Sequence, residues 1–170
     1  TALLKFCRET VFASNMDTTK SIEQVLQETG IYVGPTVGTS MLPMLKNRRD
    51  TIVVKTKTER LKPLDVALYT RGGKYILHRV LSVTDTGYII RGDNCYFDEI
   101  VPEETVIGVL TEFFRKKKHY FCTDEKYIAY AKKRVKSYKL RRVFVLTWRK
   151  VLAGIKKPIK WVLRYDKRRK

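Results

Sequence analysis

Short β-rich runs separated by turn residues fill residues 31–115 and limit the folds available to this chain. Six runs are rich in β-branched and aromatic residues: IYVG (31–34), TIVVK (51–55), DVALY (65–69), KYILHRVLSV (74–83), GYIIR (87–91) and TVIGVLTEFF (105–114). Glycine, asparagine and aspartate punctuate them at 72–73, 85–87 and 92–94. We expect a mainly β fold, a compact coiled domain whose neighbouring strands are mostly antiparallel.

Helical patterns flank this β region. The apolar spacing predicts a short helix over residues 17–30, capped by Asp17 or Thr18 and ended by Gly30. The expected organisation is an N-terminal extension with this helix (1–30), a β domain (31–115) and a tail of basic amphipathic helices (116–170). An apolar stripe at helical spacing supports the tail helix: Tyr127, Ala131, Val135 and Tyr138.

The charge lies at one end of the chain. Residues 1–114 carry 14 basic and 14 acidic side chains, whereas residues 115–170 carry 22 basic and three acidic ones, so the net charge of +19 belongs to the last third. This division argues against a uniformly basic nucleic-acid binder.

The tail has the composition of an interfacial membrane anchor. One face of the expected helix lies opposite a dense Lys/Arg face and carries Phe144, Trp148, Val151 and Ile155. The apolar stretch is too short to span a bilayer. We expect an anionic membrane surface as the partner of residues 116–170. A surface helix packed on the β domain and a nucleic-acid contact are the alternatives, because Lys and Arg beside Tyr and Trp also suit phosphates and bases.

Cysteine usage and apolar runs bear on the location of the protein. No run of about 18 apolar residues is present, and the first 15 residues lack the order of a secretory signal. Three widely spaced cysteines without a CxxC pair argue against a disulfide framework and favour a reducing compartment. We therefore expect a cytoplasmic protein, peripheral on the inner face of the membrane.

Three segments together carry candidate chemistry. GTSMLPM (38–44) places Ser40 on a tight bend, where we expect it to be exposed. In YILHRV (75–80), strand alternation puts His78 on one face with Ile76 and Val80, where desolvation favours the neutral imidazole. RGDNCYFDE (91–99) adds acids, so the chain offers a nucleophile, a base and an orienting group in the order Ser, His, Asp.

These segments resemble the conserved boxes of the signal peptidase I family. GTSMLPM resembles its nucleophile box, YILHRVLSV the box that holds the general base, and RGDN its GDN box, with the strands RRDTIVV and PLDVALY between them. LexA-like self-cleaving proteins belong to the same superfamily. The base is lysine in most of its bacterial members, whereas the match to His78 resembles the branch that uses Ser, His and Asp.

The resemblance implies roles for individual residues. Ser40 is the nucleophile and His78 its base, while Asp93, with Asp98 a close second and Glu99 a competitor, orients the imidazole. The oxyanion hole includes the backbone N–H of Ser40. The nucleophile turn also contains Gly38, where many members carry an assisting serine, together with Thr39 and Met41.

The implied function is a serine endopeptidase that cleaves a signal- or leader-peptide-like precursor bound in extended form along a strand edge. The alternatives are a LexA-like self-cleaving protein and a non-catalytic membrane or nucleic-acid-binding module on the same fold. No cofactor is expected, and Cys95 has no second cysteine at metal-ligand spacing, so no metal site is predicted.

Overall fold

The computed structural model describes residues 20–148. The chain divides into two compact units after Val135. Val151 and Ile155, two of the expected membrane-binding residues, lie outside the described part, as do the two expected caps Asp17 and Thr18.

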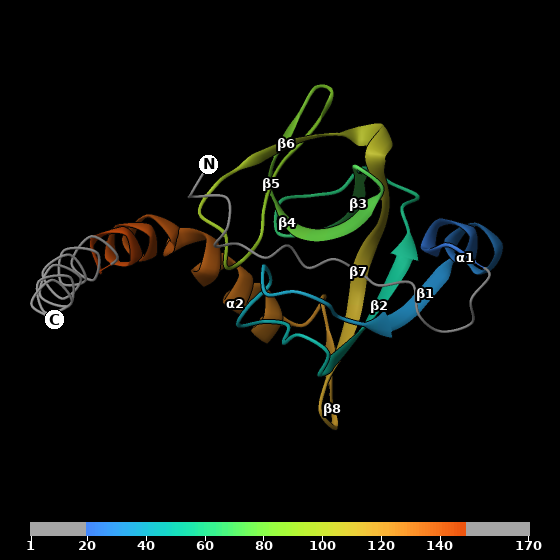
Figure 1. Cartoon of the computed structure of the whole chain (residues 1–170), viewed down its shortest axis with the longest axis horizontal. Helices are drawn as coiled ribbons and strands as arrows, with labels where there is room; N and C mark the ends of the chain where they lie inside the picture. The colour runs from blue at the N-terminus through green and yellow to red at the C-terminus, as the bar shows by residue number, and fades with distance from the viewer. Residues whose placement is uncertain (1–19, 149–170) are drawn as a thin grey trace, which may run out of the picture. The chain divides into compact units, whose positions relative to one another are not determined.

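The first unit is mainly β, an eight-stranded antiparallel sheet that curls into a half-barrel (Figure 1). The strand order is β1-β2-β7-β3-β4-β5-β6, and β8 pairs with one end of β7. The strands are β1 (Ile31–Pro35), β2 (Asp50–Thr56), β3 (Val66–Arg71), β4 (Lys74–Thr84), β5 (Gly87–Arg91), β6 (Glu99–Pro102), β7 (Val106–Arg115) and β8 (Lys118–Phe121). The prediction of an antiparallel, mainly β fold is thus confirmed.

Tight turns set the register of the central hairpin. Gly72 and Gly73 have φ values of 56° and 72°, a conformation that costs glycine little and suits a two-residue turn between β3 and β4. The resulting register pairs Ala67 with His78 and Tyr69 with Ile76.

The alternation along β4 divides the interior into two apolar clusters. Ile76 and Val80 belong to one cluster and Leu77 to the other. The alternation that the sequence predicts for this strand is confirmed. His78 lies in the middle of it and is fully buried.

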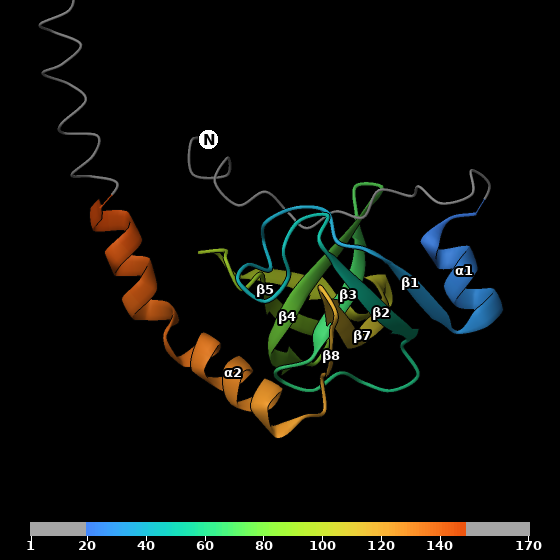
Figure 2. The same ribbon diagram turned by 90° about the horizontal axis from the view of Figure 1, so that it is seen from below.

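Helix α1 (Ile22–Thr29) lies beside β1 in both ribbon views (Figures 1 and 2). It starts later than expected, because Ser21 caps it in a reciprocal capping box with Gln24. Gly30 ends it with φ of 74°, as predicted. Ile22 and Leu26 anchor the helix in the core.

The boundary of the first unit lies further along the chain than residue 115. Strand β8 pairs with β7, and Tyr127 and Ala131 of helix α2 (Glu125–Lys136) are buried. The expected boundary at residue 115 differs because this stretch carries the basic side chains that are typical of the tail. Burial of one apolar stripe is sufficient to dock a helix whose other faces are charged.

In the second unit, residues 138–148 are helical. No helix within residues 20–148 is long and apolar enough to cross a membrane.

Candidate active site

Ser40 lies in a turn between β1 and β2 and is fully buried. The expectation of an exposed serine is therefore wrong for this structure. The reason lies in its neighbours, since Met41 and Met44 are core residues that draw the turn inward. Arg115 of β7 also donates a hydrogen bond to the Met44 carbonyl.

The loop after β5 clamps the serine turn. The Asn94 backbone N–H donates to the Ser40 carbonyl at 2.7 Å, and the Asn94 side-chain amide donates to the Thr39 carbonyl at 3.2 Å. The glycine of RGDN permits this approach. A Cβ added at Gly92 would lie 2.8 Å from the Ser40 carbonyl oxygen and 2.9 Å from His78 Nε2. The Ser40 carbonyl, the imidazole and Cys95 Sγ thus close around Gly92 and leave no room for a side chain.

The two ring nitrogens of His78 differ in their hydrogen bonding. Nδ1 lies 3.1 Å from the Tyr69 hydroxyl and 3.8 Å from Glu99 Oε1. Nε2 is buried and has no hydrogen-bond partner among residues 20–148. Burial lowers the pKa of His78 to about 4, although the Glu99 carboxylate acts in the opposite direction. The ring is therefore a neutral proton acceptor at physiological pH.

Neither aspartate expected to orient His78 does so. The Asp93 carboxylate accepts two hydrogen bonds from Arg79, at 2.8 and 2.9 Å, and a third from Tyr130. Asp98 pairs with Arg91 at 2.7 Å. Both assignments are corrected, because each carboxylate is committed to an arginine.

Glu99 is the carboxylate nearest Nδ1, and Tyr69 links the two. The Tyr69 hydroxyl donates to Glu99 Oε2 at 2.6 Å, and Arg71 holds the same oxygen at 2.5 Å. Asp98, just before β6, is instead turned to Arg91. From sequence spacing, Glu99 was a competing candidate to orient His78, and Tyr69 was not predicted. Tyr69 could have been found from its place in DVALY, two residues after Ala67, which pairs with His78.

The other residues of the nucleophile turn have structural roles. Gly38 has φ of 113°, a conformation that disfavours serine there, and its N–H donates to the Asn47 side chain at 2.9 Å. Thr39 accepts from Asn94, as described above, and Met41 is a core residue. The oxyanion role of the Ser40 N–H stays a prediction.

Helix α2 ties the two loops of the site together. The Arg134 guanidinium donates to the Asp93 carbonyl at 3.0 Å and to the Leu42 carbonyl at 3.2 Å. It therefore bridges the serine turn and the loop after β5.

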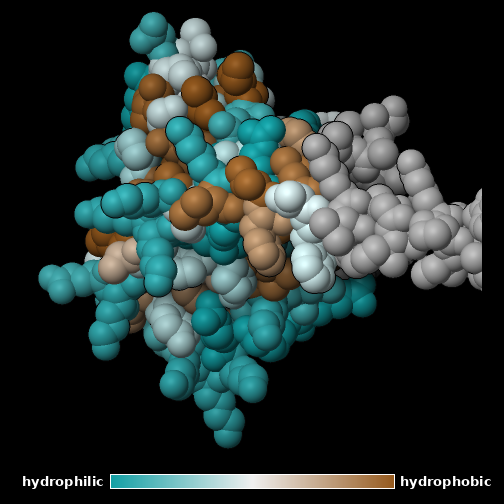
Figure 3. Space-filling view, turned by 90° about the vertical axis from the view of Figure 1, so that its left-hand side faces the viewer, coloured by the Kyte–Doolittle hydropathy of each residue, from teal (hydrophilic) through white to brown (hydrophobic). Residues whose placement is uncertain are grey.

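The described half of the expected membrane-binding face is exposed. Phe144 and Trp148 have exposed fractions of 69% and 56%, and their rings stack with centroids 6.3 Å apart. Leu140 and Val143 of the same helix are equally accessible. On the face drawn in Figure 3, hydrophobic side chains lie among hydrophilic ones.

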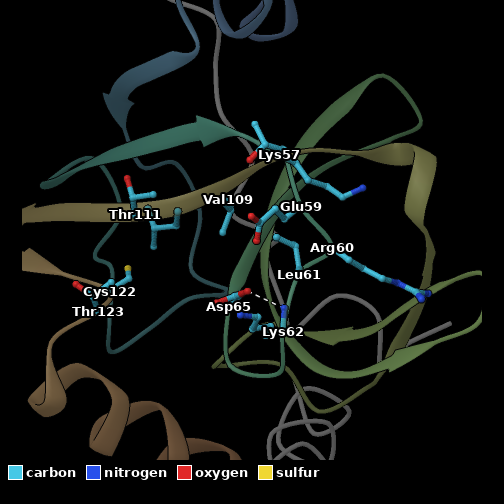
Figure 4. Close-up of a pocket in the computed structure, with 12 residues that line it drawn as sticks. Lys57, Glu59, Arg60, Leu61, Lys62, Asp65, Val109, Thr111, Cys122 and Thr123 are labelled. Atoms are coloured by element: carbon cyan, nitrogen blue, oxygen red, sulfur yellow. Dashed lines mark hydrogen bonds between the residues drawn. The ribbon is translucent and has the colours of Figure 1, made fainter.

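A cavity of about 320 Å³ lies away from the serine turn (Figure 4). Its lining comes from residues 57–62, 109–111 and 122–123, together with Asp65, and includes neither Ser40 nor His78. Burial raises the pKa of the Cys122 thiol in this wall to about 12, so it is not a thiolate nucleophile at neutral pH. Cys95 is disulfide-bonded, contrary to the expectation from cysteine spacing.

Within residues 20–148, no group of three His, Cys, Asp or Glu side chains is arranged to hold a metal ion. No known protein family, curated protein or solved structure matches this chain.

Proposed function

We propose that this protein is a serine endopeptidase in which Ser40 is the nucleophile and His78 the general base. One observation carries the proposal: within residues 20–148 the buried Nε2 of His78 lacks a hydrogen-bond partner, and it lies beside the serine turn, across Gly92. An unsatisfied buried nitrogen is costly, and a catalytic role is one physical reason for such an exception.

In the proposed reaction, Nε2 takes the Ser40 hydroxyl proton as Oγ attacks the substrate carbonyl. The tetrahedral intermediate collapses when the imidazolium returns this proton to the leaving amine, and water then hydrolyses the acyl-enzyme by the same route. A base with a pKa of about 4 forms its cation reluctantly, so the Glu99 charge matters most when the imidazolium forms. Since Ser40 and His78 are both buried, the covering residues must move to admit a substrate.

The open edge of β1 is the proposed substrate platform. β1 ends the strand order, so within residues 20–148 its outer edge is not paired with another strand. It leads directly into the Ser40 turn, and Ile31 and Val33 are exposed on it. An extended peptide can add to such an edge through main-chain hydrogen bonds. A signal- or leader-peptide-like precursor, as the resemblance implies, fits this binding mode.

Labelling of the intact protein by a serine-reactive phosphonate tests the assignment. We expect the wild-type protein and a Ser82→Ala control, altered on β4 outside the site, to gain one phosphonyl group in the mass spectrum. Ser40→Ala should gain none and should lose cleavage of any precursor peptide that the wild-type protein cleaves. Labelling that persists in folded Ser40→Ala protein would sink the proposal.

Self-cleavage in the LexA manner is distinguished by the same proteins. If incubation of dilute wild-type protein, but not of Ser40→Ala, yields two fragments at a concentration-independent rate, the substrate is the chain itself.

We further propose that residues 136–170, the second unit, attach the protein to an anionic membrane surface. The exposed Phe144 and Trp148 pair supports this, together with the 14 basic side chains and one acidic side chain of residues 136–170. Each basic residue near an anionic surface contributes about 1 kcal/mol, attenuated by salt.

Trp148 fluorescence tests the membrane proposal in the full-length chain, with Trp161→Phe leaving one source of signal. We expect a blue shift with anionic vesicles and little with zwitterionic ones. Phe144→Gln should weaken partitioning by roughly 10-fold or more, because burying a phenyl ring is worth about 1.5–3 kcal/mol. The control Phe97→Gln alters a side chain of the β unit that is also exposed, at 44%. Tight nucleic-acid binding without vesicle binding would contradict the proposal.

A further inference from the structure

We propose that Tyr69 and Glu99 form a positioning relay that keeps the ring proton of His78 on Nδ1 and thereby leaves Nε2 as the acceptor for the Ser40 proton. The inference rests on the proposed function and deepens it, since it names the residues that set the protonation geometry of the base. Neither residue contacts the reacting atoms, so both act through His78.

The sheet register brings Tyr69 to the imidazole. Ala67 is the residue opposite His78, and Tyr69 lies two residues further along β3, on the same face and diagonal to the histidine. The two ring centroids are 6.0 Å apart, and the Tyr69 hydroxyl lies 3.1 Å from Nδ1. Backbone pairing therefore sets this contact.

Counting protons determines the direction of each hydrogen bond. A tyrosine hydroxyl has one proton, and a carboxylate can only accept. Because Tyr69 donates to Glu99, its oxygen has only lone pairs for Nδ1, so the histidine must donate there. In neutral imidazole, Nε2 is then the unprotonated nitrogen. Burial and the Glu99 charge raise the pKa of Tyr69 above its ordinary value, so the hydroxyl keeps its proton.

Arg71 completes the relay on the far side. Its guanidinium donates to Glu99 Oε2 at 2.5 Å, a charge-assisted bond that orients the carboxylate. The nearest approach of Glu99 to Nδ1 is 3.8 Å, too long for a hydrogen bond. Tyr69 therefore fills the gap that a directly bound carboxylate would close in a Ser-His-Asp triad.

The relay predicts that Glu99→Leu reverses the tautomer. Leucine offers no acceptor, so the Tyr69 hydroxyl turns and donates to Nδ1, which moves the ring proton to Nε2. Tyr69→Phe removes only the hydroxyl and keeps the ring, so Nδ1 loses its acceptor and both tautomers become populated.

Nitrogen-15 spectra of labelled histidine in a Ser40→Ala parent report the tautomer without any catalysis. We expect a protonated Nδ1 and a bare Nε2 for His78 in the parent, the reverse with Glu99→Leu added, and a mixture with Tyr69→Phe added. The matched control is Glu112→Leu, which removes the carboxylate 2.8 Å from His119 Nε2 and should leave the His78 signals unchanged. In the Ser40-containing protein, Glu99→Leu should lower kcat/KM by roughly 10²–10⁴-fold, because the wrong tautomer cannot act as base.

A proton on Nε2 in the parent, or one that stays on Nδ1 in both the Glu99→Leu and Tyr69→Phe proteins, overturns the relay. If Glu99→Leu does not fold, a single Nδ1-protonated tautomer in Tyr69→Phe overturns it alone. Failure of the proposed function looks different, since the wild-type protein would then show no Ser40-dependent labelling or cleavage whatever the spectra reveal.

Discussion

The two histidines His78 and His119 each lie near a glutamate, but in different surroundings. His119 is exposed on β8, and its Nε2 lies 2.8 Å from Glu112. His78 is fully buried on β4 and reaches Glu99 through Tyr69, and in the described part of the chain its second nitrogen has no partner. The residue types are the same, so the difference in chemistry comes from burial.

The two histidines differ because one is solvated by water and the other is not. At the surface, an ion pair gains little over its hydrated partners, and such pairs contribute about 0–1 kcal/mol. In the interior, each unmet polar atom costs about 1–3 kcal/mol, so an orphaned nitrogen persists only where the surrounding fold compensates. We therefore propose a functional role for His78 and only a surface contact for His119. The predictions below test this difference between the two histidines.

The largest expected effect is on catalysis. His78→Ala should lower kcat/KM toward a Ser40-dependent peptide by at least about 10³-fold, since a serine without its base is a weak nucleophile. His119→Ala should change kcat/KM less than about twofold, because the His119 ring contacts Glu112 at the surface and is not part of the proposed site. Equal losses in the two variants would contradict this difference between the histidines.

The second effect concerns stability and compares the two aspartates. Asp93→Asn leaves the buried Arg79 without its countercharge, and we expect urea denaturation to show a loss of about 3–5 kcal/mol. Burial alone would lower the pKa of Arg79, but the Asp93 charge raises it above its ordinary value. Asp98 is half-exposed, so Asp98→Asn should cost under about 1 kcal/mol. A larger cost for Asp98→Asn would invert the comparison.

Lowering the pH should destabilise the folded protein because His78 is buried in its neutral form. Its folded pKa of about 4 lies below the ordinary 6.5, so the unfolded chain takes up the proton first as the pH falls. The contribution of His78 to stability is therefore complete above pH 6.5 and is lost between pH 6.5 and 4, by about 3 kcal/mol.

The measurement for this effect is the difference in unfolding free energy between wild type and His78→Gln across that range. Subtraction cancels the carboxylates that titrate in the same window. The His119→Gln protein should track the wild type. A parallel expectation is that kcat/KM stays level from pH 7 to about 5. A fall centred at 6.5 would show that His78 is hydrated in the working enzyme.

The smallest effect compares two glycines. Gly92→Ala places a methyl group against Ser40 and His78, and overpacking of this kind costs about 1–3 kcal/mol. We expect it also to lower kcat/KM, because it separates nucleophile from base. At Gly72, a Cβ meets nothing within 4 Å but φ is 56°, so Gly72→Ala should cost about 1 kcal/mol and leave kcat/KM unchanged. Equal kinetics in the two variants would contradict the placement of Gly92.

Much of the fold was readable from the sequence because it depends on local patterns. Strand alternation predicted which side of β4 carries His78, and Gly72-Gly73 marked the hairpin that pairs it with β3. The six predicted strands match β1, β2, β3, β4, β5 and β7 within a residue or two of their ends. Strands β6 and β8, at four residues each, are too short for periodicity to reveal.

The site depended on contacts that no local pattern contains. Sequence order suggested Asp93 for His78, but Asp93 faces Arg79 and Tyr130, which comes from a helix 37 residues away. Likewise, Ser40 looked exposed because turns usually are, whereas its methionine neighbours and the loop after β5 bury it.

The sequence by itself therefore determined the strand face on which His78 lies and supplied the residues that we propose as nucleophile and base. Only the tertiary structure decided which carboxylate reaches His78, through which tyrosine, and with which nitrogen left unpaired. The physical reason is the distance along the chain over which each property is set. Side-chain alternation follows from the geometry of one strand. Burial and hydrogen-bond partners instead depend on which distant strands pair around it.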